Sequence, residues 1–142
     1  MADILHRVGV DAPVARVFDA LTSLEGLRAW WIGDAAGDSA PGRILDFGFC
    51  RMRVLEADPA GLVHWSCIAG PEEWVGTDVS FRLTWKEGQT FILFTHANWK
   101  EPVEFMHHCS TKWATFLLSL RDWLEKGEGR PTPRDLKIHL GD

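Results

Sequence analysis

The chain has 142 residues and a formal charge of −5, with 15 Lys and Arg against 20 Asp and Glu. This length fits one domain over 1–142, and no basic patch is present of the kind that nucleic-acid binding requires. The three cysteines have no CxxC spacing and indicate neither a disulfide framework nor a zinc knuckle. Because no signal-peptide pattern and no membrane-length apolar run occurs, we expect a cytoplasmic protein without membrane insertion.

The first elements are predicted to be a strand and two short helices. Residues 4–10 alternate loosely and lead into Asp11-Ala12-Pro13, a sequence typical of a helix start. Apolar residues then recur with helical spacing over 14–21. Residues 22–25, Thr-Ser-Leu-Glu, resemble a capping box that opens a second helix. Residues 32–42 have no period and are expected to form a loop.

Residues 43–96 are predicted to form an antiparallel meander. Runs of strand-forming residues at 44–49, 51–57 and 62–68 are separated by turn residues. Over 79–86, apolar and polar residues alternate strictly, and a turn at 87–89 leads into a partner strand. This pattern predicts a hairpin whose buried face carries the following side chains: Val79, Phe81, Leu83 and Trp85, opposite Ile92, Phe94 and His96.

The last predicted element is a long amphipathic helix over 103–126. With a turn of about 100° per residue, Thr111, Asp122 and Glu125 point away from its apolar face. Gly127 can take a left-handed conformation and Pro131 prevents the helix from resuming. The apolar face contains Phe105, Cys109, Trp113, Phe116, Leu117, Leu120 and Leu124.

The order of these elements predicts an α+β fold. A curved antiparallel sheet of about six to seven strands would wrap around the long C-terminal helix, the only element able to cover it. The gap between sheet and helix is then a natural place for a cavity. The tail, 130–142, alternates weakly at Leu136, Ile138 and Leu140, and is expected to be either an added edge segment or disordered.

Short motifs spread over nearly the whole chain carry a family resemblance. They are Ala20-Leu21-Thr22, Glu25-Gly26-Leu27, Trp30-Trp31, Asp58-Pro59, Trp65, Gly76-Thr77, Val79-Ser80-Phe81, Thr95-His96, Trp99, Trp113-Ala114, Phe116-Leu117 and Ser119-Leu120. Together they resemble the SRPBCC (START-like) superfamily, and within it the small bacterial heat-shock ATPase activator-like domains, often labelled polyketide-cyclase-like. The resemblance implies a helix-grip fold around an apolar ligand cavity. It implies no single reaction, because members bind lipids, hormones or polyketides, catalyse cyclisations or stimulate a chaperone.

Candidate ligand-binding residues follow from the predicted faces of the hairpin and the long helix, and from tryptophans near element ends, where their rings could roof a cavity mouth. The alternative is that these aromatic side chains only fill the core. The candidates are Trp31, Trp65, Trp74, Phe81, Phe94, His96, Trp99, Phe105, Cys109, Trp113 and Leu117.

His96 is the one candidate acid or base, because a strand-end imidazole that faces an apolar space can exchange a proton near neutral pH. The alternative is that it only fixes the strand-to-helix connection. His107, His108 and Cys109 are adjacent, but neighbouring helical residues point about 100° apart and do not easily share an ion. His107 is expected to face solvent and His108 to reach the rim of the cavity. No metal site and no cofactor are predicted.

Three functions are compatible with the sequence. The leading hypothesis is binding or transport of a small hydrophobic or amphipathic molecule in the cavity, because the order of elements and the aromatic face favour it. This function needs no catalytic constellation. The alternatives are a cyclase-type or hydratase-type enzyme that uses His96, and a chaperone-interacting protein. Phe91, Leu93 and Leu118 are expected to face outward, so either a homodimer interface or the tail would cover them.

Overall fold

The computed structural model describes residues 1–142. Three helices and seven strands follow one another in the order predicted, except that a short strand lies at 36–37, within the segment 32–42 that was expected to be a loop. None of the helices has the length and apolarity needed to cross a bilayer. The elements are β1 (Ala2–Val10), α1 (Val14–Thr22), α2 (Leu24–Trp30), β2 (Ala36–Gly37), β3 (Ile44–Asp46), β4 (Arg51–Asp58), β5 (Leu62–Ala69), β6 (Asp78–Lys86), β7 (Gln89–Trp99) and α3 (Glu104–Lys126).

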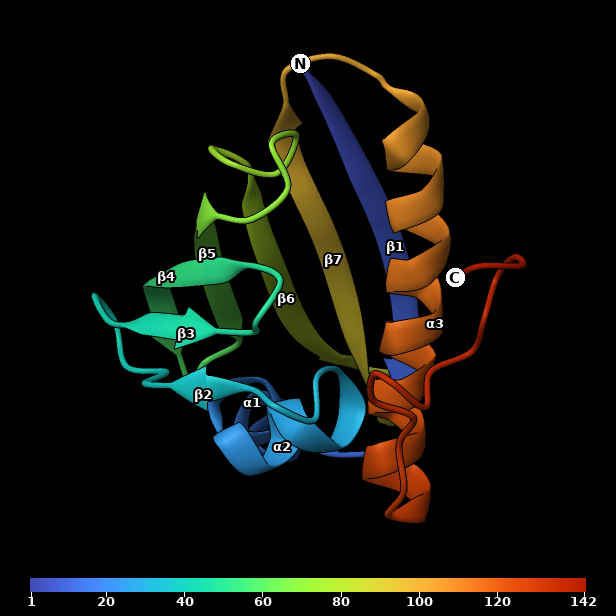
Figure 1. The fold of residues 1–142 in the computed structure, drawn as a ribbon. Coiled ribbons are helices and arrows are strands. Elements are labelled where there is room, and N and C mark those ends of the chain that lie inside the picture. Colours follow the sequence, from blue (N-terminus) through green and yellow to red (C-terminus); the bar gives the residue numbers. More distant parts are fainter.

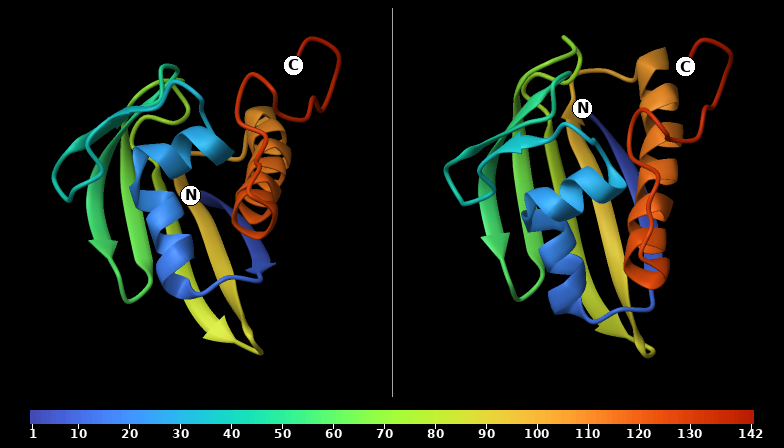
Figure 2. Two further views of the ribbon diagram at one scale, coloured as in Figure 1. Left: turned by 90° about the horizontal axis from the view of Figure 1, so that it is seen from below. Right: turned by 60° about the horizontal axis from the view of Figure 1, so that its bottom comes forward.

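All strands belong to one antiparallel sheet with the order β1-β7-β6-β5-β4-β3-β2. The first strand pairs with the last, so β1 and the short β2 form the two edges of the sheet. The sheet curves, and α3 lies on its concave side together with α1 and α2 (Figure 1, Figure 2). This arrangement is the helix-grip α+β fold, and it confirms the prediction.

The hairpin of β6 and β7 is closed by Glu87 and Gly88, which both have positive φ, at 57° and 75°. Two such residues form the tight turn that suits the twist of a hairpin. Alternation places Phe81 and Phe94 in the core, as predicted, with 0% and 1% of their surface exposed. The prediction is wrong for Trp85, which is 56% exposed. It pairs with Thr90 near the turn, where the sheet extends beyond the core.

The start of α2 differs by one residue from the predicted capping box. Ser23, not Thr22, is the N-cap, and its hydroxyl accepts a hydrogen bond of 3.0 Å from the amide of Gly26. Thr22 still belongs to α1 and donates to the carbonyl of Phe18. Gly26 also lets the two helices approach closely, because a Cβ there would lie 2.5 Å from the carbonyl oxygen of Ala20.

The long helix α3 has the predicted end and starts one residue later than predicted. Gly127 adopts the left-handed C-cap conformation with φ of 79°, and its amide donates to the carbonyl of Trp123. The buried face also contains Ser119, which the apolar pattern did not include. Its hydroxyl donates to the carbonyl of Trp30 at 2.8 Å and accepts from the amide of Arg130 at 2.6 Å. Ser119 therefore ties α2, α3 and the tail together.

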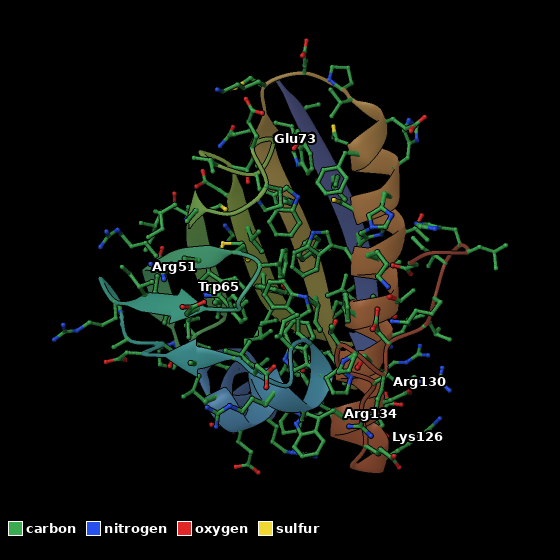
Figure 3. All side chains as sticks on the ribbon, in the orientation of Figure 1. Arg51, Trp65, Glu73, Lys126, Arg130 and Arg134 are labelled. Atoms are coloured by element: carbon green, nitrogen blue, oxygen red, sulfur yellow. The ribbon has the colours of Figure 1, made fainter.

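The C-terminal segment, 127–142, returns along α3 and forms neither a helix nor a strand of the sheet (Figure 1). Its only β-type contact is an isolated parallel bridge between Thr132 and Ile32. Leu136 and Leu140 are 48% and 100% exposed, so the alternation in the tail did not mark a strand. Figure 3 shows Lys126, Arg130 and Arg134 together at the C-terminal end of α3, far from Glu73.

Candidate functional site

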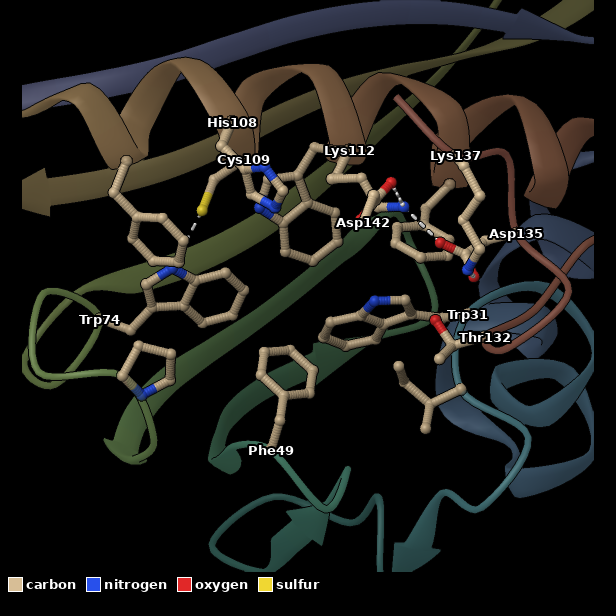
Figure 4. Close-up of a pocket in the computed structure, with 15 residues that line it drawn as sticks. Trp31, Phe49, Trp74, His108, Cys109, Lys112, Thr132, Asp135, Lys137 and Asp142 are labelled. Atoms are coloured by element: carbon tan, nitrogen blue, oxygen red, sulfur yellow. Dashed lines mark hydrogen bonds and ion pairs between the residues drawn. The ribbon is translucent and has the colours of Figure 1, made fainter. Parts of the chain in front are cut away.

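A cavity of about 380 Å³ opens between α3, three connections and the tail (Figure 4). Its size lies within the range of about 300–1,000 Å³ that is typical of small-molecule sites. The lining side chains are Trp31, Ile32, Phe49, Pro71, Trp74, Phe105, His108, Cys109, Lys112, Trp113, Phe116, Thr132, Asp135, Lys137 and Asp142.

One wall of the cavity is aromatic. The ring of Trp113 on α3 lies 4.9 Å from that of Trp31 and is stacked at 15° against Trp74, with 6.0 Å between the ring centroids. Phe49 packs edge-on against Trp74, with 5.3 Å between the ring centroids. These residues come from segments far apart in the sequence and together form the apolar side of the cavity. Phe49 is 46% exposed, whereas the three tryptophans are only 2–4% exposed.

The other wall is polar and is organised by Lys112. Its ammonium group bonds both Asp135 and Asp142, the latter at 2.9 Å, and donates to the carbonyl of Leu136 at 3.0 Å. Burial alone would lower the pKa of Lys112, but the hydrogen bonds that its ammonium group donates to the two carboxylates outweigh this effect and raise the pKa. The bond from Lys112 lowers the pKa of Asp142 to about 2. The wall is therefore ionised at neutral pH.

His96 lies beneath the cavity and does not line it. Its Nδ1 accepts from the indole N–H of Trp113 at 3.1 Å, and its Nε2 is 2.8 Å from the hydroxyl of Thr77. Because an indole nitrogen only donates, Nε2 carries the proton and donates to Thr77, whose hydroxyl donates to the carbonyl of Trp74. Burial lowers the pKa of His96 to about 3. Both ring nitrogens are thus occupied, and the ring is neutral.

Cys109 lines the cavity beside Trp74, whose indole N–H donates to the Cys109 sulfur at 3.4 Å. Burial raises the pKa of this thiol to about 11. Since the thiolate is the nucleophilic form, Cys109 contributes a neutral, weakly polar surface to the cavity.

The predicted ligand-binding residues divide into two groups. Trp31, Trp74, Phe105, Cys109 and Trp113 line the cavity. The others belong to the packed core and do not reach it: Trp65, Phe81, Phe94, His96, Trp99 and Leu117. The reason is visible at Trp31, which stacks on Trp65 at 3° and 6.0 Å and so separates Trp65 from the cavity.

Several lining residues were not among the sequence candidates. Phe49 lies in the turn before β4, and nothing local distinguishes it from a surface aromatic. Lys112 could have been predicted to line the cavity, because it lies three residues after Cys109 and four before Phe116 and so shares their helix face. Asp135 and Asp142 could not have been predicted from the sequence, because a segment without regular structure has no periodic pattern of apolar residues. His108 reaches the cavity as predicted, and His107 is exposed.

Comparison with solved structures supports the same fold. The Aha1 dimer from Colwellia psychrerythraea is 43% identical, with a TM-score of 0.82 over 91% of this chain and 100% of that chain. SSP2350 from Staphylococcus saprophyticus is 18% identical, with a TM-score of 0.76 over 92% and 97%. CalU16 from Micromonospora echinospora is 22% identical, with a TM-score of 0.75 over 87% and 74%. The last two show the fold alone.

A comparison with curated proteins finds no match. The family model described as "Activator of Hsp90 ATPase homolog 1-like protein" matches residues 11–125, from the start of α1 through nearly all of α3. This span contains the sheet strands β2 to β7 and most of the cavity wall. The chain therefore belongs to the Activator of Hsp90 ATPase homolog 1-like family, within the SRPBCC superfamily.

Proposed function

We propose that this protein binds a small amphipathic molecule that has a flat apolar part and a polar end. The observation that carries the proposal is the division of the cavity into two walls, aromatic on one side and ionised on the other. A flat ring system can lie against Trp31, Trp74 and Trp113, while its polar end meets the group around Lys112. Such a site fixes orientation with few polar groups and gains affinity from apolar contact.

The proposal is tested by a ligand screen on the purified full chain. Native mass spectrometry and tryptophan fluorescence would be followed with fatty acids, sterols, flavonoids and aromatic polyketides. We expect aromatic amphiphiles with a polar end to bind one per chain and to quench fluorescence, because tryptophans line the cavity. If none of the four classes binds, or if binding leaves the fluorescence unchanged, the proposal is wrong.

Phe49→Ala is the informative variant, because Phe49 is 46% exposed and its loss should not prevent folding. We expect a fall in affinity of about tenfold, since part of an aromatic contact is lost. Trp85→Ala is the matched control, an aromatic side chain 56% exposed outside the cavity. Equal affinities of the two variants would argue against binding in this cavity.

The enzyme alternative has less support from the geometry. A cyclase or hydratase that uses His96 needs a ring nitrogen directed at the substrate, and both nitrogens of His96 are hydrogen-bonded within the core. The expectation is that His96→Gln leaves turnover of any identified substrate unchanged when the variant folds. A loss of turnover without a loss of ligand affinity would favour the enzyme alternative.

The family name supports a second proposal, that the chain interacts with an Hsp90-type chaperone. The matching family is described by its likeness to an activator of the Hsp90 ATPase. The test is the ATPase rate of bacterial Hsp90 with and without the purified chain. A rate that rises with chain concentration and saturates would support the interaction, and an unchanged rate would exclude activation.

We also propose that the chain forms a homodimer. The 43% identical Aha1 from Colwellia psychrerythraea was solved as a dimer, and the outer face of β1 and β7 exposes Leu5 at 68% and Leu93 at 42%. Light scattering on the purified chain would give the mass directly. A monomeric mass at high protein concentration would contradict this proposal.

A further inference from the structure

Three potential metal ligands converge where the tail meets α3, at the edge of the cavity. One ring nitrogen of His108, one of His139 and one carboxylate oxygen of Asp142 all lie within 4.8 Å of one another. His108 comes from α3, whereas His139 and Asp142 come from the returning tail. The rings of His108 and His139 are tilted against each other with 5.4 Å between centroids.

The hydrogen bonds around this cluster leave ligand atoms available. His139 Nδ1 is 2.8 Å from the carbonyl oxygen of Leu140. Since a carbonyl only accepts, Nδ1 carries the proton and Nε2 keeps its lone pair. This is the usual state of a metal-binding histidine, whose other ring nitrogen donates to a carbonyl or carboxylate. The ring of His108 stacks on Phe105 at 10°, which fixes its plane.

Asp142 is held in a similar way. Its Oδ2 accepts from the ammonium group of Lys112 at 2.9 Å and from the amide of Ile138 at 2.8 Å. Its Oδ1 takes part in neither bond. A carboxylate anchored through one oxygen can offer the other to a cation, and metal-binding carboxylates are commonly supported by such hydrogen bonds.

We propose that His108, His139 and Asp142 bind one divalent transition-metal cation, with Zn²⁺ as the best fit. Two imidazoles and one carboxylate suit Zn²⁺, Ni²⁺ or Cu²⁺, whereas Ca²⁺ and Mg²⁺ prefer oxygen ligands. Three protein ligands leave a fourth tetrahedral position for water or another donor. Because His108 and Asp142 both line the cavity, that position lies at the cavity edge.

The cluster has to contract slightly to hold the ion. In a tetrahedral zinc site, nitrogen and oxygen ligands lie about 3.3 Å apart. The ligand atoms of His108, His139 and Asp142 lie within 4.8 Å of one another, so they have to move closer together. His139 is exposed and belongs to a segment without regular structure, so its side chain can rotate without disturbing the core. The bound cation would then fasten the tail to α3. The metal proposal does not rest on the organic ligand proposed above, although Asp142 belongs to both sites.

The test is calorimetric titration of the metal-stripped full chain with Zn²⁺. We expect one equivalent to bind, and His139→Ala to weaken binding by at least about tenfold because it removes one of three ligands. His139 is exposed, so this variant should fold as the native chain does. His107→Ala is the matched control, an exposed histidine next to His108 that lies outside the cluster, and its affinity should equal that of the native chain.

Co²⁺ provides a second readout, because its visible spectrum reports ligand type and geometry. We expect a tetrahedral or five-coordinate spectrum without a strong thiolate charge-transfer band. A strong thiolate band would assign the metal to a cysteine and overturn the proposal. Absence of binding would also overturn it, as would equal affinities of His139→Ala and His107→Ala.

Discussion

The aromatic side chains of this protein occupy two regions that differ in what covers them. In the core over β5, β6 and β7, Trp65, Phe81 and Phe94 are each at most 1% exposed, and Trp30 of α2 packs edge-on against Phe81. At the cavity, Phe49 is 46% exposed, and Trp74 contacts α3 on one side only, through Cys109 and Trp113. Helices cover the first region, whereas the second is bordered by one side of α3 together with loops and the tail. The same residue type therefore serves as core or as cavity lining according to the element packed above it.

The largest expected effect compares one aromatic side chain from each region. Phe81→Ala should lower the free energy of unfolding by about 3–5 kcal/mol, because it leaves a cavity among packed rings. Phe49→Ala should cost less than about 1 kcal/mol, because this side chain is already half exposed. Urea unfolding followed by circular dichroism measures both. A similar decrease in the free energy of unfolding in the two variants would show that the two regions are packed equally tightly.

The neutral His96 in the core predicts a pH dependence of stability. Burial lowers its pKa from 6.5 to about 3, so in this interval the unfolded chain binds a proton that the folded chain does not. The contribution of His96 to stability should therefore be fully present well above pH 6.5 and should decrease as the pH falls through 6.5 toward 3. Between pH 6 and pH 4 this residue should account for a loss of about 2–3 kcal/mol in the free energy of unfolding.

Urea unfolding at both pH values gives the change in the free energy of unfolding for the native chain and for His96→Gln. The difference between these two changes is the contribution of His96, whatever the absolute stability of the variant. If the variant does not fold, nuclear magnetic resonance of the imidazole nitrogens in the native chain gives the answer. A ring that is protonated at both nitrogens at pH 5 would contradict the prediction.

The hydrogen bond from Trp113 to His96 can be separated from packing by a second pair of variants. Trp113 and Trp99 are both buried next to His96, but only Trp113 donates to it, and the indole N–H of Trp99 has no partner. Both Trp→Phe changes remove similar volume. Trp113→Phe should cost about 1–3 kcal/mol more, because it leaves Nδ1 of His96 without a donor. Equal losses in urea unfolding would show that the bond contributes nothing to stability.

The smallest expected effect is local and concerns the polar wall. Lys112→Met removes the cation between Asp135 and Asp142, and the repulsion of the two carboxylates should release the tail. Amide hydrogen exchange over 134–142 should become about tenfold faster, with little change in the sheet. The control is Lys126→Met, which removes only an exposed ion pair with Asp122 at 3.7 Å. If both variants exchange alike, Lys112 does not hold the tail.

The regular elements could be predicted because their signals are local. Alternation over 79–86 placed Phe81 inward, and the Gly127 and Pro131 signals ended α3 at the observed residue. The errors also have local causes. Trp85 follows the alternation of its strand but lies beyond the covered part of the sheet, and Ser23 replaced Thr22 as the cap because α1 continued one residue further.

The sequence by itself determined the fold class, the boundaries of the long helix and the presence of a large aromatic interior, because periodicity and capping depend on neighbours within a few residues. Only the tertiary structure decided which aromatic side chains border the cavity, since that depends on how helices and loops cover the sheet. It also decided the partners of His108. Helix geometry separates His108 from His107 along the chain, whereas the returning tail brings His139 and Asp142 beside it.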